Sequence, residues 1–263
     1  MTAADRPTAD PPGITADPRL LAAVAAHPHP LVFLTVSGAH LYGFASPDSD
    51  VDLRGTHLLP LERVVGLDPG PDTVEVSEVR DGLEIDLVTH DLRKFIELLL
   101  KRNGYVLEQL LSPLIVVSSP AFDEMRELAP ACLTRNHGHH YLGFAATQWS
   151  LFEKEDPRRV KPLLYVYRVL LTGIALMRTS EMECNLERLA AAAGLSDVLE
   201  LIALKRSDTE RGVLASADMA YHERRYRDLI AQLELAMAES KLPEGPSARA
   251  ALDALLARSR LGR

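Results

Sequence analysis

Residues 36–55 read VSGAHLYGFASPDSDVDLRG, and this stretch decides the fold that we expect for the chain. It overlaps the end of an apolar run, 31–36, whose content of Val, Phe and Thr predicts a buried strand. The run ends at Ser37 and Gly38, where glycine permits a sharp turn and a close approach of a ligand to the backbone. A strand followed by a glycine turn therefore opens the organising element of the sequence.

A second strand with two carboxylates follows this turn about a dozen residues later. Asp50 and Asp52 alternate with apolar residues, so they project from one strand face, roughly 7 Å apart. Mg²⁺ relieves the repulsion of such a pair and completes its shell with substrate phosphates. The glycine turn offers backbone N–H groups to anions, and the two features together are what phosphoryl transfer needs. The alternative interpretation is a turn followed by a strand whose aspartates are merely solvated.

The composition limits the class of protein. The chain has 263 residues, 47% of them hydrophobic and 25% charged, which is typical of a soluble globular protein with a sizeable core. A formal charge of −8 argues against broad, unspecific nucleic-acid binding and leaves room for a local basic patch. Two cysteines provide no disulfide framework, and no apolar run approaches the length of a membrane span. We therefore expect a cytoplasmic protein without membrane association.

The order of predicted elements indicates an α+β fold. Residues 1–17, rich in proline, are expected to be a disordered lead-in. Residues 18–118 mix helices with strands, and residues 119–263 contain only helical patterns. We expect a small mixed-sheet domain followed by an all-α helical domain, with the strands at 31–36, 51–59, 73–79 and 83–89 and a final one at 114–117.

The predicted strand 83–89 carries a further carboxylate candidate. Glu84 and Asp86 share one face of this strand, opposite its apolar residues. A place in the same small sheet would put Asp86 beside Asp50 and Asp52 and complete a three-carboxylate metal site. Two-metal catalysis uses such a ligand, and a carboxylate can also help to deprotonate an attacking hydroxyl group. Periodicity alone does not choose between Glu84 and Asp86, and a solvated surface residue is the alternative for each.

A polar ridge lies on the predicted helix 160–178, which is otherwise strongly apolar. Lys161, Tyr165 and Arg168 follow one another at helical spacing along this ridge. A solvated face is the simple interpretation. However, so apolar a helix is expected to be buried, and buried cations need anionic partners, of which a nucleoside triphosphate between the two domains is one. Lys94 and Arg54 are additional candidates for phosphate contacts.

The segment from Gly38 to Asp52 resembles the signature of the DNA polymerase β-like nucleotidyltransferase superfamily. Within that superfamily, 38–43 and 49–55 are most similar to the predicted nucleotidyltransferases associated with RNA-repair ligases, the RlaP-type group. The similarity extends over roughly 31–215 and includes the segments 84–86, 91–95, 103–108 and 161–168.

The resemblance implies roles for residues at matching positions. Asp50 and Asp52 would hold two Mg²⁺ ions, with Mn²⁺ as a substitute, and Asp86 would be the third carboxylate. Gly38 and its neighbours would cradle the β- and γ-phosphates of a nucleoside triphosphate. Ala39 stands where the family usually has serine, so its hydroxyl is missing here, and Ser37 is positioned to compensate. The expected nucleotide-binding residues are Ser37, Gly38, Ala39, His40, Tyr42, Ser49, Arg54, Lys94, Lys161, Tyr165 and Arg168.

The leading hypothesis is a Mg²⁺-dependent nucleotidyltransferase that moves a nucleoside monophosphate to an acceptor hydroxyl and releases pyrophosphate. The sequence does not name the acceptor, and an RNA end, a protein and a small molecule are all candidates. One alternative, favoured by Ala39, is a nucleotide-binding regulatory or antitoxin-like protein that keeps the fold without turnover. A third hypothesis is a metal-dependent phosphohydrolase, which would need no acceptor.

Overall fold

A computed structural model describes residues 13–207 and 219–262, so residues 1–12 of the expected lead-in lie outside the described part. Five strands form one mixed sheet in the order β3-β4-β2-β1-β5. β2 pairs antiparallel with β1 and parallel with β4, while β3–β4 and β1–β5 are antiparallel. The strands are β1 (Leu31–Val36), β2 (Val51–His57), β3 (Thr73–Arg80), β4 (Leu83–Asp91) and β5 (Ile115–Val117).

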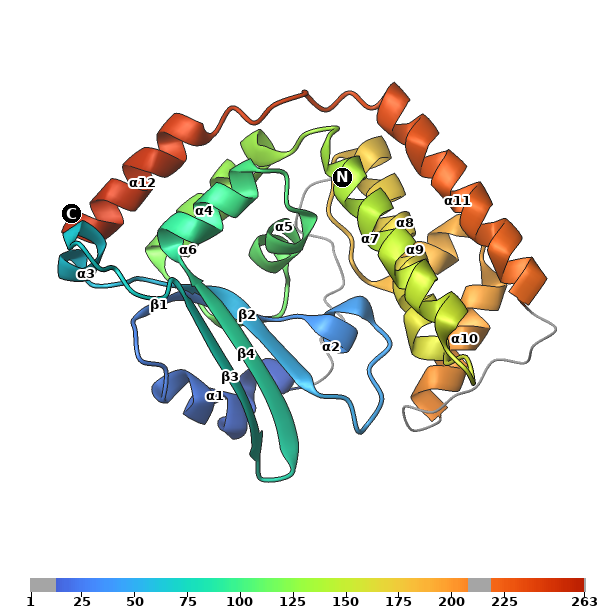
Figure 1. Cartoon of the computed structure of the whole chain (residues 1–263), viewed down its shortest axis with the longest axis horizontal. Coiled ribbons are helices and arrows are strands. Elements are labelled where there is room, and N and C mark those ends of the chain that lie inside the picture. The colour runs from blue at the N-terminus through green and yellow to red at the C-terminus, as the bar shows by residue number, and fades with distance from the viewer. Residues whose placement is uncertain (1–12, 208–218, 263) are drawn as a thin grey trace.

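Helices cover the sheet and then continue the chain beyond it, which confirms the α+β expectation (Figure 1). In Figure 1, α4, α5 and α6 lie on one side of the sheet, α1 lies on the other, and α7 to α11 gather beside it. The helices are α1 (Pro18–Ala25), α2 (Gly38–Tyr42), α3 (Leu61–Val65), α4 (Leu92–Leu100), α5 (Gly104–Leu111), α6 (Pro120–Leu128), α7 (His137–Lys154), α8 (Val160–Thr179), α9 (Leu186–Ala193), α10 (Ser196–Ser207), α11 (Met219–Glu239) and α12 (Arg249–Leu261), with short 3₁₀ turns η1 (Ile14–Ala16) and η2 (Ala129–Cys132).

Local sequence explains where many of these elements begin. The carboxylate of Asp17 accepts a hydrogen bond from the Arg19 backbone at the start of α1, and Pro18 occupies the first helical position. Asn103 and Ser119 cap α5 and α6 in the same way. The η1 turn and the Asp17 cap place residues 13–17 in ordered structure, although the sequence analysis assigns them to the lead-in.

Helix α8 runs through the core of the molecule. Fourteen of its twenty residues are buried, and one continuous cluster of apolar side chains extends from the sheet into the helices around α8. The helix is long and apolar enough to cross a membrane, which corrects the expectation that no apolar run has that length. Because 78% of its most apolar 18-residue segment is buried inside the structure, the apolar composition fits a core helix.

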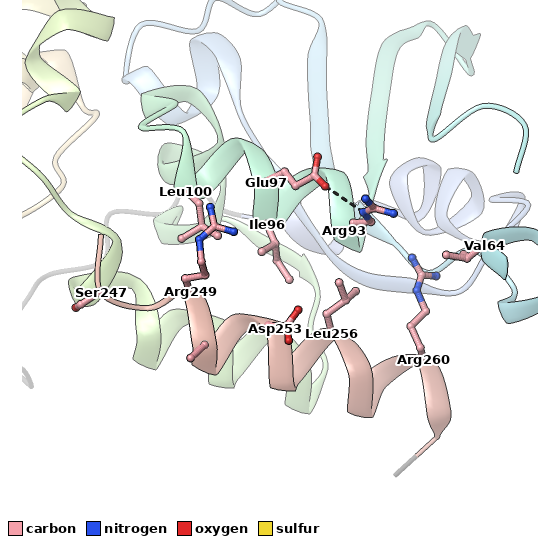
Figure 2. Close-up of a pocket in the computed structure, with 11 residues that line it drawn as sticks. Val64, Arg93, Ile96, Glu97, Leu100, Ser247, Arg249, Asp253, Leu256 and Arg260 are labelled. Carbon is pink, nitrogen blue, oxygen red and sulfur yellow. Dashed lines mark hydrogen bonds and ion pairs between the residues drawn. The ribbon is translucent and has the colours of Figure 1, made fainter. Parts of the chain in front are cut away.

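The last helix returns to the sheet-containing half. α12 packs against α4 and α6, and Leu252 and Leu255 on its inner face are buried. A cavity of about 880 Å³ remains between α4 and α12, where Ile96 and Leu256 face each other across the gap (Figure 2). α6 packs against β1, and α12 packs against α4 and α6, so both helices lie in the sheet-containing half although the sequence assigns them to the helical domain. The domain limits stay a prediction.

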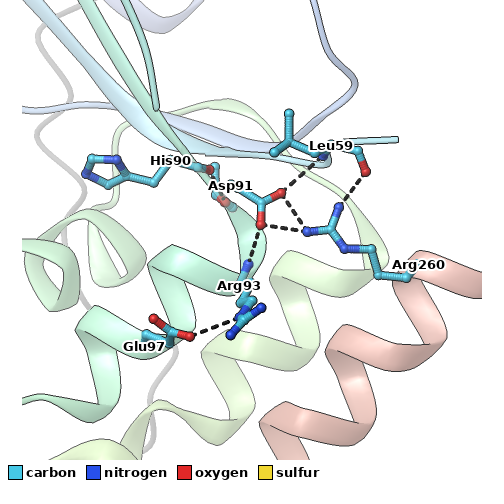
Figure 3. Close-up of polar contacts among 7 residues, drawn as sticks. Leu59, His90, Asp91, Arg93, Glu97 and Arg260 are labelled. Carbon is cyan, nitrogen blue, oxygen red and sulfur yellow. Dashed lines mark hydrogen bonds and ion pairs between the residues drawn. The ribbon is translucent and has the colours of Figure 1, made fainter. Parts of the chain in front are cut away.

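A buried ion pair attaches α12 at the end of β4 (Figure 3). The guanidinium of Arg260 donates to both oxygens of Asp91, at 2.6 and 2.7 Å, and also to the backbone oxygen of Leu59. The same carboxylate accepts the backbone N–H groups of Leu59 and of Arg93, the latter at the start of α4. Asp91 therefore joins β4, the chain after β2, α4 and α12 through a single side chain.

Candidate active site

The predicted carboxylates gather at the beginning of β2. Asp50 immediately precedes this strand, and Asp52 is its second residue. In the parallel pair of β2 and β4, Asp52 stands opposite Asp86, so both side chains project from the same face of the sheet. The structure therefore brings together Asp52 and Asp86, which are 34 positions apart in the sequence.

Arg54 lies between these two carboxylates. It is two residues beyond Asp52 and projects from the same sheet face. Its Nη2 donates to Oδ1 of Asp52 at 2.6 Å and to Oδ2 of Asp86 at 2.9 Å. Its Nη1 donates to the backbone oxygens of Leu53 and Asp86. The predicted phosphate ligand Arg54 is thus at the site and is bound to the carboxylates themselves.

The two paired aspartates have different surroundings. The side chain of Asp52 is 18% exposed, whereas that of Asp86 is 43% exposed. Burial raises the pKa of Asp52 above its ordinary value, and the neighbouring carboxylates of Asp50 and Asp86 add to this effect, while Arg54 and Lys161 oppose it. Asp52 is therefore the inner carboxylate of the site and Asp86 the one open to solvent.

The glycine turn packs directly on Asp52. The backbone N–H of Ser37 donates to the backbone oxygen of Asp52 at 2.8 Å. Gly38 has φ +60°, and a Cβ at this position would lie 1.9 Å from Oδ2 of Asp52, so any side chain here would displace the carboxylate. The hydroxyl of Ser37 is buried and has no hydrogen-bond partner in the described structure. A buried hydroxyl without a hydrogen-bond partner is an unusual and costly arrangement, which suits a polar ligand.

Two further predicted residues tie the short helix α2 to the carboxylate segment. The ring of His40 lies near the backbone of Ser49 and Asp50, its Nε2 is buried without a hydrogen-bond partner in the described structure, and burial lowers the pKa of His40. The Ser49 hydroxyl accepts the backbone N–H of Ser46 at 2.9 Å and contacts the Ser46 hydroxyl. Ala39 is buried in α2. These residues shape the loop before Asp50, and the Ser49 hydroxyl already has partners there.

Helix α8 supplies the other wall of the site. Lys161 is close enough to Asp52 to lower the pKa of that carboxyl, and Tyr165 lies near both Asp50 and Asp52. Burial raises the pKa of Tyr165 well above its ordinary value. Tyr105, at the start of α5, lies close enough to Arg54 to raise the pKa of the guanidinium and was not among the predicted site residues. Its place is set by tertiary packing, and no local pattern marks it.

The structure corrects the expectation for Arg168 and Tyr42. Arg168 donates to Oε1 of Glu108 at 2.6 Å, and both side chains are only 2% exposed. The guanidinium also lies 3.9 Å above the centroid of the Tyr42 ring, while the Tyr42 hydroxyl donates to Oε2 of Glu108. As predicted, the buried Arg168 needs an anionic partner, and in this structure the partner is Glu108. Tyr42 and Arg168 therefore support the site from within the core.

Lys94, another predicted nucleotide-binding residue, lies away from the carboxylates. Its ammonium group donates to Asp72 and to Thr73, each at 2.7 Å. Thr73 pairs with His90, four residues beyond Asp86 on β4. At about 3.3 Å per residue, that contact is roughly 13 Å along the strand from Asp86. Lys94 therefore stabilises the far end of the sheet and does not contact the carboxylates.

A buried lysine in the helical region was not predicted as part of the site. Lys205 of α10 is 1% exposed, and its ammonium group donates to the Ser46 hydroxyl at 2.7 Å. Since Ser46 in turn contacts Ser49, Lys205 braces the loop that leads to Asp50. In sequence Lys205 is an ordinary basic residue in the last turn of a helix, and only the tertiary fold gives it this contact.

The donor set is suited to a divalent cation with phosphate. Carboxylate oxygens are preferred ligands of Mg²⁺, the side-chain-free Gly38 packs on the Asp52 carboxylate, and the adjacent Ser37 has a buried hydroxyl without a partner. Within residues 13–207 and 219–262, no three His, Cys, Asp or Glu side chains are already grouped in a manner that could hold a metal ion. At this site Arg54 lies between Asp52 and Asp86.

Comparison with known proteins gives a family match. The sequence profile described as RlaP, the RNA repair pathway DNA polymerase beta family, matches residues 14–258. The uncharacterized protein MJ0002 of Methanocaldococcus jannaschii is 32% identical over 156 residues, which are 59% of this chain and 63% of that protein. The uncharacterized protein YcgL of Bacillus subtilis is 26% identical over 143 residues, 54% of each chain. The chain thus spans less than two thirds of the length of these relatives.

A solved structure of a nucleotidyltransferase-like protein from Exiguobacterium sibiricum aligns with 95% of this chain and 81% of its own, at 15% identity and a TM-score of 0.35. So low a score adds nothing to the assignment, which depends on the family profile. That profile extends over both the strands that carry the carboxylates and the helices that follow them. The chain belongs to the RlaP family, the RNA repair pathway DNA polymerase β family.

Proposed function

We propose that this protein is a divalent-metal-dependent nucleotidyltransferase that transfers a nucleoside monophosphate from a nucleoside triphosphate to an acceptor hydroxyl. The observation that carries the proposal is the direct register of Asp52 and Asp86 on one sheet face, with Gly38 packed against Asp52. Carboxylates next to a side-chain-free turn are what a metal-bound triphosphate requires. Membership of a polymerase β family supports the same chemistry.

The side chains have distinct roles in this proposal. Asp50, Asp52 and Asp86 would hold Mg²⁺, or Mn²⁺ in its place. When bound, the metal would supply positive charge against the phosphate oxygens and the departing pyrophosphate. The backbone N–H groups of Gly38 and Ala39, at the start of α2, would donate to the terminal phosphates, and the buried Ser37 hydroxyl would gain a partner.

Asp86 would act on the acceptor. Its side chain is 43% exposed, while that of Asp52 is largely buried, so an acceptor arriving from solvent meets Asp86 first. The Asp86 carboxylate would accept the proton of the acceptor hydroxyl as its oxygen bonds to the α-phosphorus. The bond between the α-phosphorus and the oxygen that bridges to the β-phosphorus breaks, and pyrophosphate leaves with both electrons of that bond.

An RNA end is the first acceptor to test, because the family description places its members in RNA repair. The formal charge of −8 favours a short contact with an RNA end over a long nucleic-acid interface. The assay combines α-labelled nucleoside triphosphates with RNA ends, proteins and small hydroxyl compounds. We expect labelled acceptor with the wild type and at least a hundredfold less with Asp52→Asn.

Asp72→Asn is a matched control for that assay, because it removes an exposed carboxylate that pairs with Lys94 at the other end of the sheet. It is expected to label acceptors as the wild type does. Equal labelling by the wild type and Asp52→Asn would refute the assignment.

A second candidate function is nucleotide binding without turnover. Ala39 favours it, because the hydroxyl usual at this position in the family is absent here. Calorimetry with Mg²⁺ and a nucleoside triphosphate separates the two candidates. Binding that needs Asp52 but yields no product with any acceptor would support the non-catalytic protein.

A further inference from the structure

Arg54 holds the carboxylate pair through an anchored guanidinium. Nη2 bridges one oxygen of Asp52 and one oxygen of Asp86, while Nη1 donates to the backbone oxygens of Leu53 and Asp86. The Arg54 side chain is only 10% exposed. A guanidinium fixed on both carboxylates and on the strand backbone is a structural part of the site and not a loose surface charge.

This position puts Arg54 in competition with a metal ion. Arg54 already supplies a positive charge to the two carboxylates that a divalent cation would need, and it uses one oxygen of each. A cation on the remaining oxygens would lie within a few ångströms of the guanidinium, where the repulsion between like charges is strong because Arg54 and Asp52 are largely buried. The metal alone therefore meets a site whose negative charge is partly neutralised.

A metal that arrives with a nucleotide meets different conditions. The triphosphate carries more negative charge than the cation carries positive, so the complex offers anionic oxygens to the guanidinium as well as a cation to the carboxylates. A planar guanidinium matches phosphate oxygens as well as it matches carboxylates. Repulsion between the metal and Arg54 is then offset by phosphate.

We propose that Arg54 is a built-in counter-ion that makes the carboxylate site favour a divalent cation bound to a nucleoside triphosphate over the cation alone. This proposal rests on the proposed function, since it takes Asp52 and Asp86 as metal ligands. It assigns Arg54 as a positioning and selectivity residue, a role different from the simple phosphate contact expected from the sequence.

The test measures Mn²⁺ binding directly, from the loss of the free Mn²⁺ signal in electron paramagnetic resonance. Titrations use Mn²⁺ alone and Mn²⁺ with an α,β-methylene nucleoside triphosphate. We expect the wild type to bind Mn²⁺ weakly alone and more tightly with the analogue. Arg54→Gln is expected to bind Mn²⁺ alone at least about tenfold more tightly than the wild type does. Addition of the analogue is expected to raise its Mn²⁺ affinity by a smaller factor than it raises that of the wild type.

Two variants control for folding and for net charge. Arg54→Lys keeps a positive charge without the fork that reaches both carboxylates, so its affinity for Mn²⁺ alone should lie between those of the wild type and Arg54→Gln. Arg93→Gln removes one positive charge from an exposed arginine that pairs with Glu97 on α4, and it should leave Mn²⁺ affinity at the wild-type value. Circular dichroism verifies that each variant is folded, and Arg54→Lys decides the question if Arg54→Gln does not fold.

Asp52→Asn separates failure of this inference from failure of the proposed function. If Mn²⁺ binding requires Asp52 but neither Arg54 variant binds Mn²⁺ alone more tightly, the counter-ion role is refuted and the metal site stands. If Mn²⁺ binding does not depend on Asp52 in any variant, the metal site and the counter-ion role are both refuted.

Discussion

The buried ion pair between Arg168 and Glu108 provides a quantitative test of how the helices are joined to the sheet-containing half. Arg168 lies on α8, Glu108 on α5 and Tyr42 on α2, so the three side chains connect elements from both halves. The ion pair spans 2.6 Å at 2% exposure, and the guanidinium lies 3.9 Å from the Tyr42 ring centroid. Water cannot compensate either charge at this depth.

Arg168→Met should leave the Glu108 carboxylate buried without its cation. Removal of one partner from a buried pair costs about 3–5 kcal/mol of the free energy of unfolding, and Glu108→Leu should cost a similar amount for the converse reason. The double variant removes both charges together, so we expect it to lie within about 2 kcal/mol of the wild type. Tyr42→Phe deletes one long hydrogen bond of 3.3 Å and should cost only about 1 kcal/mol.

The measurement is urea unfolding of the wild type, both single variants and the double variant, followed by circular dichroism and treated as a double-mutant cycle. A coupling energy of several kcal/mol is expected, because each single variant strands a charge that the double variant does not contain. Single-variant costs below about 1 kcal/mol, or costs that simply add in the double variant, would refute the buried network.

Three other outcomes are expected. Burial lowers the pKa of His57 and of His137 to about 4, so the unfolded chain binds protons at a higher pH than the folded protein does. Each histidine therefore lowers the free energy of unfolding by about 3 kcal/mol as the pH falls from about 6.5 to 4. In urea unfolding, the stability of the His57→Gln and His137→Gln variants should depend less steeply on pH in this range. The raised pKa of Asp52 means that its charged form disfavours folding at pH 8. The Asp52→Asn variant should therefore have a melting temperature equal to or above that of the wild type, and a clearly lower melting temperature would contradict this. Arg260→Gln breaks the buried ion pair of α12 and should cost about 3 kcal/mol in urea unfolding, whereas Arg258→Gln, which breaks an exposed pair, should cost less than about 1 kcal/mol.

Local pattern predicts the strands well because their signals are short and repetitive. Period-two alternation identifies β2 and β4, and it also places Asp52 and Asp86 on a definite face of each strand. The turn between β3 and β4 is recognisable because Asp81 and Gly82 both adopt positive φ, 47° and 77°, as a two-residue hairpin turn of this kind demands. Local chemistry alone is sufficient for these features.

The partners of buried charges are not encoded locally. Arg54 lies two residues after Asp52, yet nothing in the spacing says that its guanidinium reaches across to Asp86. Arg168 and Glu108 are 60 residues apart, and only the packing of α8 on α5 makes them a pair. A pattern can therefore identify a cation that needs an anion, but the choice between an internal carboxylate and a ligand depends on the tertiary fold.

The register of β4 determines whether the proposed site exists. A slip of one residue against β2 would turn Asp86 to the opposite sheet face and set an apolar neighbour, Ile85 or Leu87, opposite Asp52. The tight turn at Asp81-Gly82 fixes β4 against β3, and Asp91 fixes its other end through Leu59, α4 and Arg260. Since both ends of the strand are held in this way, the ion pair that attaches the last helix also helps to keep two carboxylates together at the other end of the same strand.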